Sequence, residues 1–277
     1  MNRKELNPDS SPQAAFGARL RSSREERKWT QEELGQRMEY ASCHMSAVET
    51  GRKPPTLRFS RSADLAFGSG DMFERLWREL RNGSLLEGFP EYVGYEGRAV
   101  EIRLFQVGIV PGLLQTPEYA RVLADTAVAR GAIPPEQGDE RVALVAERQA
   151  ALVRPRPPMV MAVLDESCIR RPVGGPEIMQ AQLQRLVEFA ALPNTVLQVA
   201  PYDMGELRPF DLPVNLLTLS DRSMVAYAEA QTRGHMDRET TLIVPLLTAY
   251  HQLQAEALSQ AASVAMIKQA MEGTIRG

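Results

Sequence analysis

Residues 30–51, TQEELGQRMEYASCHMSAVETG, decide how the first part of this 277-residue chain folds. Thr30 is a favourable helix N-cap, and Glu33 stands three residues later, where a capping box places it. Apolar residues recur at helical spacing on both sides of an interruption at 39–42, namely Leu34, Met38, Met45 and Val48. The stretch therefore predicts two short helices separated by a turn of about four residues.

Two such helices can cross at a steep angle, which leaves the second one free to enter the major groove of DNA. The competing interpretation is a helical hairpin that only fills a hydrophobic core. The resemblance of residues 30–54 to known helix-turn-helix sequences favours the helix-turn-helix. We therefore predict a DNA-binding module.

Three further helices complete the predicted module. Residues 14–27 are amphipathic, residues 57–66 carry regularly spaced apolar side chains, and residues 72–80 have one apolar face that Asp71 is expected to cap. Residues 1–12 lack periodicity and predict a flexible arm. We expect an all-α, five-helix domain over residues 13–83.

Charge is distributed unevenly along the chain. Residues 1–62 hold 12 Lys/Arg against 8 Asp/Glu, a formal +4, whereas the rest carries −7 and the whole −3. A basic end joined to an acidic body is typical of a small DNA-binding module with a separate effector domain. Two cysteines predict no disulfide framework, and no apolar run resembles a signal peptide or a membrane span, so we expect a cytoplasmic protein.

The second part of the chain alternates between strand and helix patterns. After a connector at 84–97, the sequence predicts helices at 117–130, 141–152, 176–192 and from about 238 to the C-terminus. Short apolar stretches of strand length lie between them, at 101–110, 160–167, 195–202, 215–221 and 224–230. We expect a multidomain chain whose residues 98–277 form an α/β or α+β effector and dimerisation domain.

The first module resembles the Cro/cI-type, or xenobiotic-response-element-type, helix-turn-helix of bacterial repressors, which is lambda-repressor-like in fold. The resemblance rests on Thr30-Gln31-Glu32-Glu33-Leu34, on Met38 and on Met45-Ser46-Ala47-Val48-Glu49-Thr50-Gly51, followed by Arg52, Lys53 and Pro54, and covers about residues 14–82. It implies a homodimer on double-stranded DNA. The DNA-binding residues that it implies are Thr30, Gln31, Ser42, Cys43, His44, Ser46, Ala47, Arg52 and Lys53.

The positions that would read bases depart from the usual pattern. Ser42, Cys43 and Ala47 stand where Arg, Gln or Asn give bidentate recognition of a base. Glu39 replaces the usual turn glycine, and Ala41 replaces the expected capping Ser or Thr. We therefore expect affinity to depend on phosphate contacts, and selectivity to depend on DNA shape and on the spacing of the dimer.

The second domain resembles the C-terminal domain of WhiJ-like actinobacterial regulators. The matching segments are VPGLLQTPEYAR (110–121), LDESCIRRPVGGPEIMQAQL (164–183) and NTVLQVAPY (194–202). Because genes of this group often neighbour one for a small acidic protein, the resemblance implies a possible small antagonist partner. A small-molecule effector is the other signal that we consider.

Two groups of residues in the second domain are candidate sites. Asp165-Glu166-Ser167-Cys168 combines two carboxylates with two nucleophiles, but no histidine signature supports catalysis. We therefore favour the interpretation that these residues cap a turn. We expect no enzyme activity, no cofactor and no metal site. Arg170 and Arg171, with Gly174 and Gly175 before the helix at 176–192, could bind an anionic ligand, although a tight turn is the favoured interpretation.

The leading hypothesis is a transcriptional regulator that binds promoter DNA as a dimer and receives a signal through residues 98–277. Two alternatives stay open. One is an antitoxin-like protein that mainly sequesters a small partner. The other is a ligand-processing enzyme domain fused to a DNA-binding head.

Overall fold

The computed structural model describes residues 12–82, 88–229 and 234–275. Contacts divide the chain into two compact units, Met1–Leu85 and Leu86–Gly277, which are described separately below. The predicted arm at 1–12 lies outside the described residues except for Pro12, where the first helix begins. In the described part of the chain, no helix is long and apolar enough to cross a membrane.

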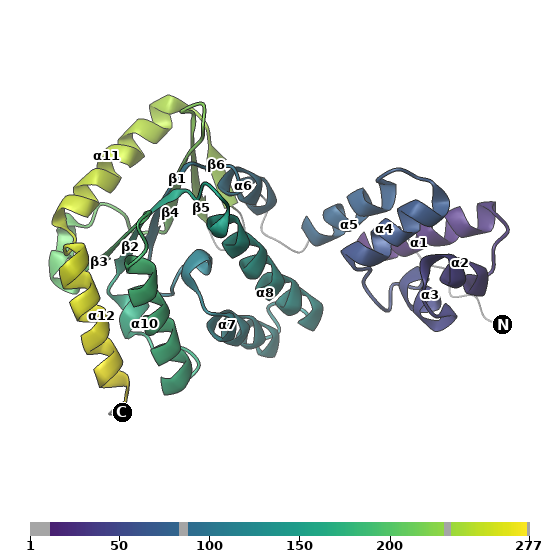
Figure 1. Ribbon diagram of the computed structural model, residues 1–277, viewed down its shortest axis with the longest axis horizontal. Helices are drawn as coiled ribbons and strands as arrows, with labels where there is room; N and C mark the ends of the chain where they lie inside the picture. Colours follow the sequence, from purple (N-terminus) through teal and green to yellow (C-terminus); the bar gives the residue numbers. More distant parts are fainter. Residues whose placement is uncertain (1–11, 83–87, 230–233, 276–277) are drawn as a thin grey trace. The chain divides into compact units, whose positions relative to one another are not determined.

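Over residues 12–82 the N-terminal unit contains five helices, as the sequence predicts (Figure 1). They are α1 (Pro12–Glu26), α2 (Gln31–Met38), α3 (Ser42–Glu49), α4 (Leu57–Phe67) and α5 (Met72–Asn82). Their apolar faces meet in one core, in which the ring of Phe16 lies against those of Phe59 and Phe73. Gly17 brings α1 close to α3, because a Cβ there would lie 2.6 Å from the carbonyl oxygen of Val48.

Side-chain caps fix where these helices begin. The predicted capping box at Thr30 and Glu33 is confirmed, with the Glu33 amide donating to the Thr30 hydroxyl and the Thr30 amide to the Glu33 carboxylate. The expectation that Asp71 caps α5 is wrong. The buried carboxylate of Asp64, on α4, accepts the backbone N–H groups of Phe73 and Glu74, each at 2.9 Å. A tertiary contact thus replaces the local cap.

The C-terminal unit is built on a mixed six-stranded sheet with the order β3-β2-β1-β4-β5-β6. The two pairings β1–β2 and β2–β3 are parallel, and the other three are antiparallel. The strands are β1 (Glu101–Gln106), β2 (Met159–Asp165), β3 (Thr195–Ala200), β4 (Val214–Thr218), β5 (Met224–Glu229) and β6 (Gly234–Asp237). The predicted combination of an all-α domain with an α/β or α+β domain is confirmed.

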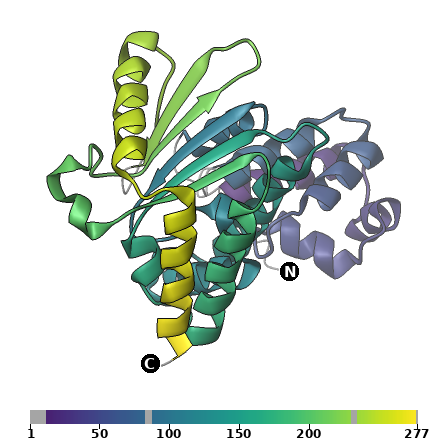
Figure 2. The same cartoon turned by 60° about the vertical axis from the view of Figure 1, so that its left-hand side comes forward.

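Helices cover both faces of the sheet (Figure 2). The helix α11 (Thr240–Glu256) packs on one face, where Tyr250 and Leu253 are fully buried. The other face is covered by the helices α6 (Phe89–Glu96), α7 (Pro117–Ala129), α10 (Pro176–Ala190) and α12 (Gln260–Ile275). The remaining helices are α8 (Pro135–Ala150), the short α9 (Ser167–Arg170) and the 3-10 helices η2 (Gly112–Leu114), η3 (Ala151–Val153) and η4 (Tyr202–Leu207).

Two details differ from the sequence-based expectation. The connector expected at 84–97 includes α6, whose Tyr92 is buried in the core of the C-terminal unit. The strand β6 was not foreseen, because four residues give too short an alternation. The helices expected from about 238 onward are α11 and α12, which are separated at 257–259.

Candidate nucleic-acid interface

The turn between α2 and α3 keeps the helix-turn-helix geometry without the usual glycine. Glu39 adopts the left-handed conformation that glycine would normally supply, with φ 62°. Gly35 is the residue that has to be small, because a Cβ there would lie 2.4 Å from the carbonyl oxygen of Tyr40. Ala41 begins α3 without a side-chain hydrogen bond. The first turn of the helix therefore lacks a side-chain cap from this residue.

One side of α3 is exposed and carries only small side chains. Ser42 and Cys43 are exposed and Ser46 and Ala47 are half-buried, whereas the intervening Met45 and Val48 are buried in the core. Four of the predicted DNA-binding residues thus share one face of a helix. A face without long side chains allows the helix backbone to approach DNA closely.

Two cations stand at the C-terminal end of α3. The backbone N–H groups of Arg52 and Lys53 both donate to the carbonyl oxygen of Ala47 and so cap the helix. The Arg52 side chain folds back, with Nε 2.9 Å from Thr50 Oγ1 and Nη2 3.4 Å from Ser46 Oγ. Both charges are exposed beside the small-residue face. This is where phosphate contacts are expected.

His44 has a packing role that the sequence did not indicate. Its half-buried ring lies against the rings of Tyr40 and Phe59, at centroid distances of 4.9 and 5.4 Å. Burial, together with the charge of Lys53, lowers the pKa of His44 below its ordinary value of 6.5. Lys53 Nζ lies 3.5 Å from His44 Nδ1. The neutral ring thus positions Lys53. The predicted direct contact of His44 with DNA stays a prediction.

Gln31 belongs to a buried polar cluster. Its Nε2 donates to Oε2 of Glu49 at 2.8 Å, and the Glu49 side chain is fully buried. Arg24, on α1, donates to the same carboxylate through Nε at 2.5 Å and Nη2 at 2.9 Å, and Arg21 approaches to 3.6 Å. The hydrogen bonds from Arg24 to Glu49 raise the pKa of the guanidinium.

This cluster holds the start of α2 to the end of α3. Sequence reasoning missed it, although one signal was present. Glu49 follows Met45 at the spacing of the buried face, where an ionised residue requires a partner.

The glycine pair before α10 forms a turn. Gly174 and Gly175 have φ of 73° and 88°, and Pro176 begins the helix. Arg170 is bound to Glu166, with Nε 3.0 Å from Oε1, and Arg171 extends toward Gly108. The tight-turn interpretation accounts for these contacts. The anion site that the sequence suggests at these four residues stays a prediction.

The polar residues after β2 hold the end of the sheet together. Asp165 accepts the Ser167 backbone N–H and hydroxyl, and it pairs with Arg208 at 2.7 Å. The Cys168 thiol is buried beside the carbonyl oxygens of Gln106 and Ile109, and burial raises its pKa to about 12. A thiol with that pKa is protonated at neutral pH and is a poor nucleophile.

Across residues 12–82, 88–229 and 234–275, no group of His, Cys, Asp and Glu side chains could hold a metal ion.

Comparison with known families assigns both parts of the chain. A model described as a helix-turn-helix domain matches residues 15–74, and one described as a domain of unknown function (DUF5753) matches residues 89–269. No curated protein and no solved structure gave a match. The first match assigns residues 15–74 to a helix-turn-helix domain, which indicates a DNA-binding regulator.

Proposed function

The chain belongs to the family defined by this domain of unknown function, and we propose that it is a sequence-specific transcriptional regulator that binds promoter DNA as a dimer. The observation that carries the proposal is the exposed small-residue face of α3 with Arg52 and Lys53 at its end. The finer assignment to the Cro/cI type rests on the residue pattern from Thr30 to Pro54.

The contacts support different roles for different residues on this surface. Arg52 and Lys53 contribute phosphate contacts, which give salt-dependent affinity without reading sequence. Ala47 offers a methyl group for contact with thymine, and Ser42 offers a hydroxyl that can donate or accept. Selectivity then depends on DNA shape and on the distance between the two half-sites of a dimer.

We assign dimerisation and signal reception to the C-terminal unit. A signal received there changes the spacing or freedom of two DNA-binding heads and so changes their joint affinity for an operator. The signal is a small antagonist protein or a small molecule. We propose no catalytic role, because the nucleophile candidate Cys168 is buried with a raised pKa and Ser167 is bonded to Asp165.

Cys43→Glu tests the DNA face without removing a packing contact. Cys43 is exposed in the first turn of α3, where a carboxylate is favourable for the helix but repels phosphate. With a duplex from the region upstream of the gene, we expect the full-length variant to lose at least about tenfold in affinity in a gel shift, equivalent to about 1.4 kcal/mol. Leu65→Glu, on the exposed part of α4, is the matched control.

The double variant Arg52→Ala/Lys53→Ala tests the phosphate contacts. If each cation neutralises one phosphate, the slope of log K against log salt concentration becomes less steep by about 1.8. Unchanged affinity in both Cys43→Glu and the double variant would place the DNA-binding surface elsewhere. A single copy of the full chain bound to the intact operator, measured by analytical ultracentrifugation, would reject the dimer.

A further inference from the structure

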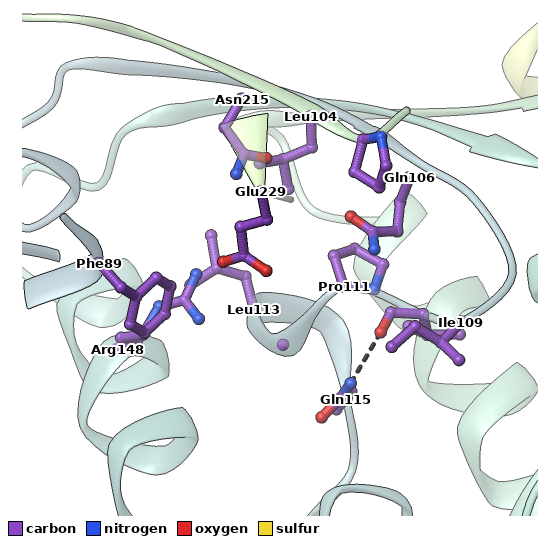
Figure 3. Close-up of a pocket in the computed structure, with 13 residues that line it drawn as sticks. Phe89, Leu104, Gln106, Ile109, Pro111, Leu113, Gln115, Arg148, Asn215 and Glu229 are labelled. Atoms are coloured by element: carbon purple, nitrogen blue, oxygen red, sulfur yellow. Dashed lines mark hydrogen bonds between the residues drawn. The ribbon is translucent and has the colours of Figure 1, made fainter. Parts of the chain in front are cut away.

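A pocket in the C-terminal unit has the composition of a ligand site. It holds about 190 Å³ and lies between the sheet and the segment 109–115, with α6 and α8 at one side (Figure 3). Its apolar part consists of side chains such as Leu104, Leu113 and Phe89. Its polar part consists of Gln106, Asn215, Glu229, Gln115 and Arg148. A cavity of about 150 Å³ can hold benzene, so this pocket has room for a molecule of about ten non-hydrogen atoms.

The strand register explains why polar groups gather at this end of the sheet. Leu104, Asn215 and Tyr227 are direct neighbours across β1, β4 and β5. Gln106 and Glu229 stand two residues further along β1 and β5, and therefore on the same face. Figure 3 shows Gln106, Asn215 and Glu229 projecting from the strands toward the wall that carries Leu113 and Arg148.

Arg148 is the one cation among the described residues that line the pocket, and its charge is already neutralised. Arg148, on α8, donates to the buried Glu96 through Nε at 2.7 Å and Nη2 at 2.8 Å, and its guanidinium lies over the ring of Phe89. Burial lowers the pKa of Arg148, but the charge of Glu96 and, to a smaller extent, that of Glu229 outweigh burial and raise the pKa. Nη1 lies close to the backbone of Gly112, 3.2 Å from where a Cβ would be. Arg148 is thus a fixed part of the wall.

Several polar groups on the sheet side remain available to a ligand. Within the described residues, no hydrogen bond engages the side-chain amides of Gln106 and Asn215. Glu229 accepts the hydroxyl of Tyr227 at 3.1 Å and forms no ion pair with Arg148. Counted over the described residues, Arg148 and Glu96 cancel each other, and Glu229 leaves the pocket with one net negative charge.

We propose that this pocket binds a small organic cation, an amine with an apolar body of about ten non-hydrogen atoms. The ammonium group would bind Glu229, the amides of Gln106 and Asn215 would bind a second polar group, and the apolar body would pack on Leu104 and Leu113. This inference rests on the proposed function, because it names the class of small-molecule signal that the C-terminal unit receives. An anionic ligand fits poorly, since Glu96 already occupies the guanidinium of Arg148.

Tyramine is a suitable probe because it combines an amine, an aromatic ring and a phenol in ten non-hydrogen atoms. Its neutral analogue tyrosol and the anion 3-(4-hydroxyphenyl)propanoate are the matched comparisons. By isothermal titration of the full chain, we expect tyramine to bind at least about tenfold more tightly than either, because a charge-assisted hydrogen bond contributes more than a neutral one.

Glu229→Gln keeps an oxygen acceptor for Tyr227 and removes the charge. We expect it to weaken tyramine binding by about 10- to 100-fold and to leave tyrosol binding unchanged. Glu272→Gln, exposed on α12, is the control that should bind tyramine like the natural chain. Asn215→Leu should weaken tyramine and tyrosol together, because both carry the phenol.

Three outcomes would overturn the proposal: no saturable tyramine binding up to about 10 mM, equal binding of tyrosol or the anion, or full tyramine affinity in Glu229→Gln. The gel shift is run separately with no probe present. Lost DNA binding with intact tyramine binding would reject the proposed regulator and keep the pocket. Intact DNA binding without tyramine binding would reject the proposed pocket and keep the proposed regulator.

Discussion

The buried ion pair between Arg24 and Glu49 gives the sharpest prediction for stability. Arg24→Met keeps most of the apolar stem of the side chain but removes two of the three hydrogen bonds that the Glu49 carboxylate accepts. It also removes the bond from Arg24 Nη1 to the carbonyl oxygen of Trp29. The Glu49 side chain is 0% exposed, so water cannot replace the lost donors without opening the core.

The expected loss is large for a domain of this size. Removing one partner of a buried ion pair costs about 3–5 kcal/mol, and Gln31 and Arg21 stay near the carboxylate, so we expect about 3 kcal/mol. For a domain of this length, that corresponds to a fall in Tm of about 12–24 °C. Arg24→Met/Glu49→Leu should recover most of the loss, because it removes the stranded charge as well.

Tryptophan fluorescence reports this change in the full chain. Both tryptophans, Trp29 and Trp77, lie in the N-terminal unit, so the signal follows that unit alone. Arg58→Met, at an exposed position of α4, is the control and should stay within about 0.5 kcal/mol of the natural chain. A loss below about 1 kcal/mol for Arg24→Met, or a double variant no more stable than the single one, would refute the reasoning.

Three further predictions concern other contacts. Asp64→Ala should destabilise the N-terminal unit by about 2 kcal/mol because it removes the cap of α5. Asp71→Ala should change the stability little. Equal effects of the two variants in the same fluorescence assay would contradict the assignment of Asp64 as the cap. Because the pKa of His44 is lowered in the folded chain, the unfolded chain takes up the proton first as the pH falls, and stability decreases below the ordinary pKa of 6.5. His44→Phe should reduce the dependence of the unfolding free energy on pH, measured from pH 7.5 to 5. An unchanged dependence would contradict the role given to His44. Tyr250→Phe removes a buried hydrogen bond to the carbonyl oxygen of Met161 at 2.8 Å and should lower the stability of the C-terminal unit by about 1–2 kcal/mol. Unfolding followed by circular dichroism measures this loss. An unchanged stability would show that water satisfies the carbonyl oxygen.

Local patterns predicted the helices well because their causes are local. The capping box at Thr30 and Glu33 and the apolar repeat in 31–49 involve residues within one or two turns of each other, and the structure has both. The same holds for α10, whose Pro176 and regular apolar stripe define its start and its buried face.

Contacts between distant residues could not be predicted in this way. Asp64 caps a helix that begins eight residues later, and Arg24 binds a carboxylate 25 residues away. The pocket polar groups come from β1, β4 and β5, which only the strand order brings together. Gln106, Asn215 and Glu229 look like ordinary surface residues in the sequence, because an amide or a carboxylate near a strand end carries no local signal of its neighbours.

The structure of α3 has a consequence for how this regulator selects DNA. A long side chain such as Arg or Gln on the exposed face would read one base by itself, at a gain of about 1–3 kcal/mol for a good bidentate pair. Ser42, Cys43 and Ala47 cannot do so, whereas Arg52 is held by Thr50 and Ser46 in a position suited to phosphate. In the proposed dimer, most of the affinity of one head is then independent of sequence, and discrimination comes from two heads acting at a fixed distance. Control of that distance by the C-terminal unit would therefore change selectivity as well as occupancy, since a head that acts alone has little sequence preference of its own.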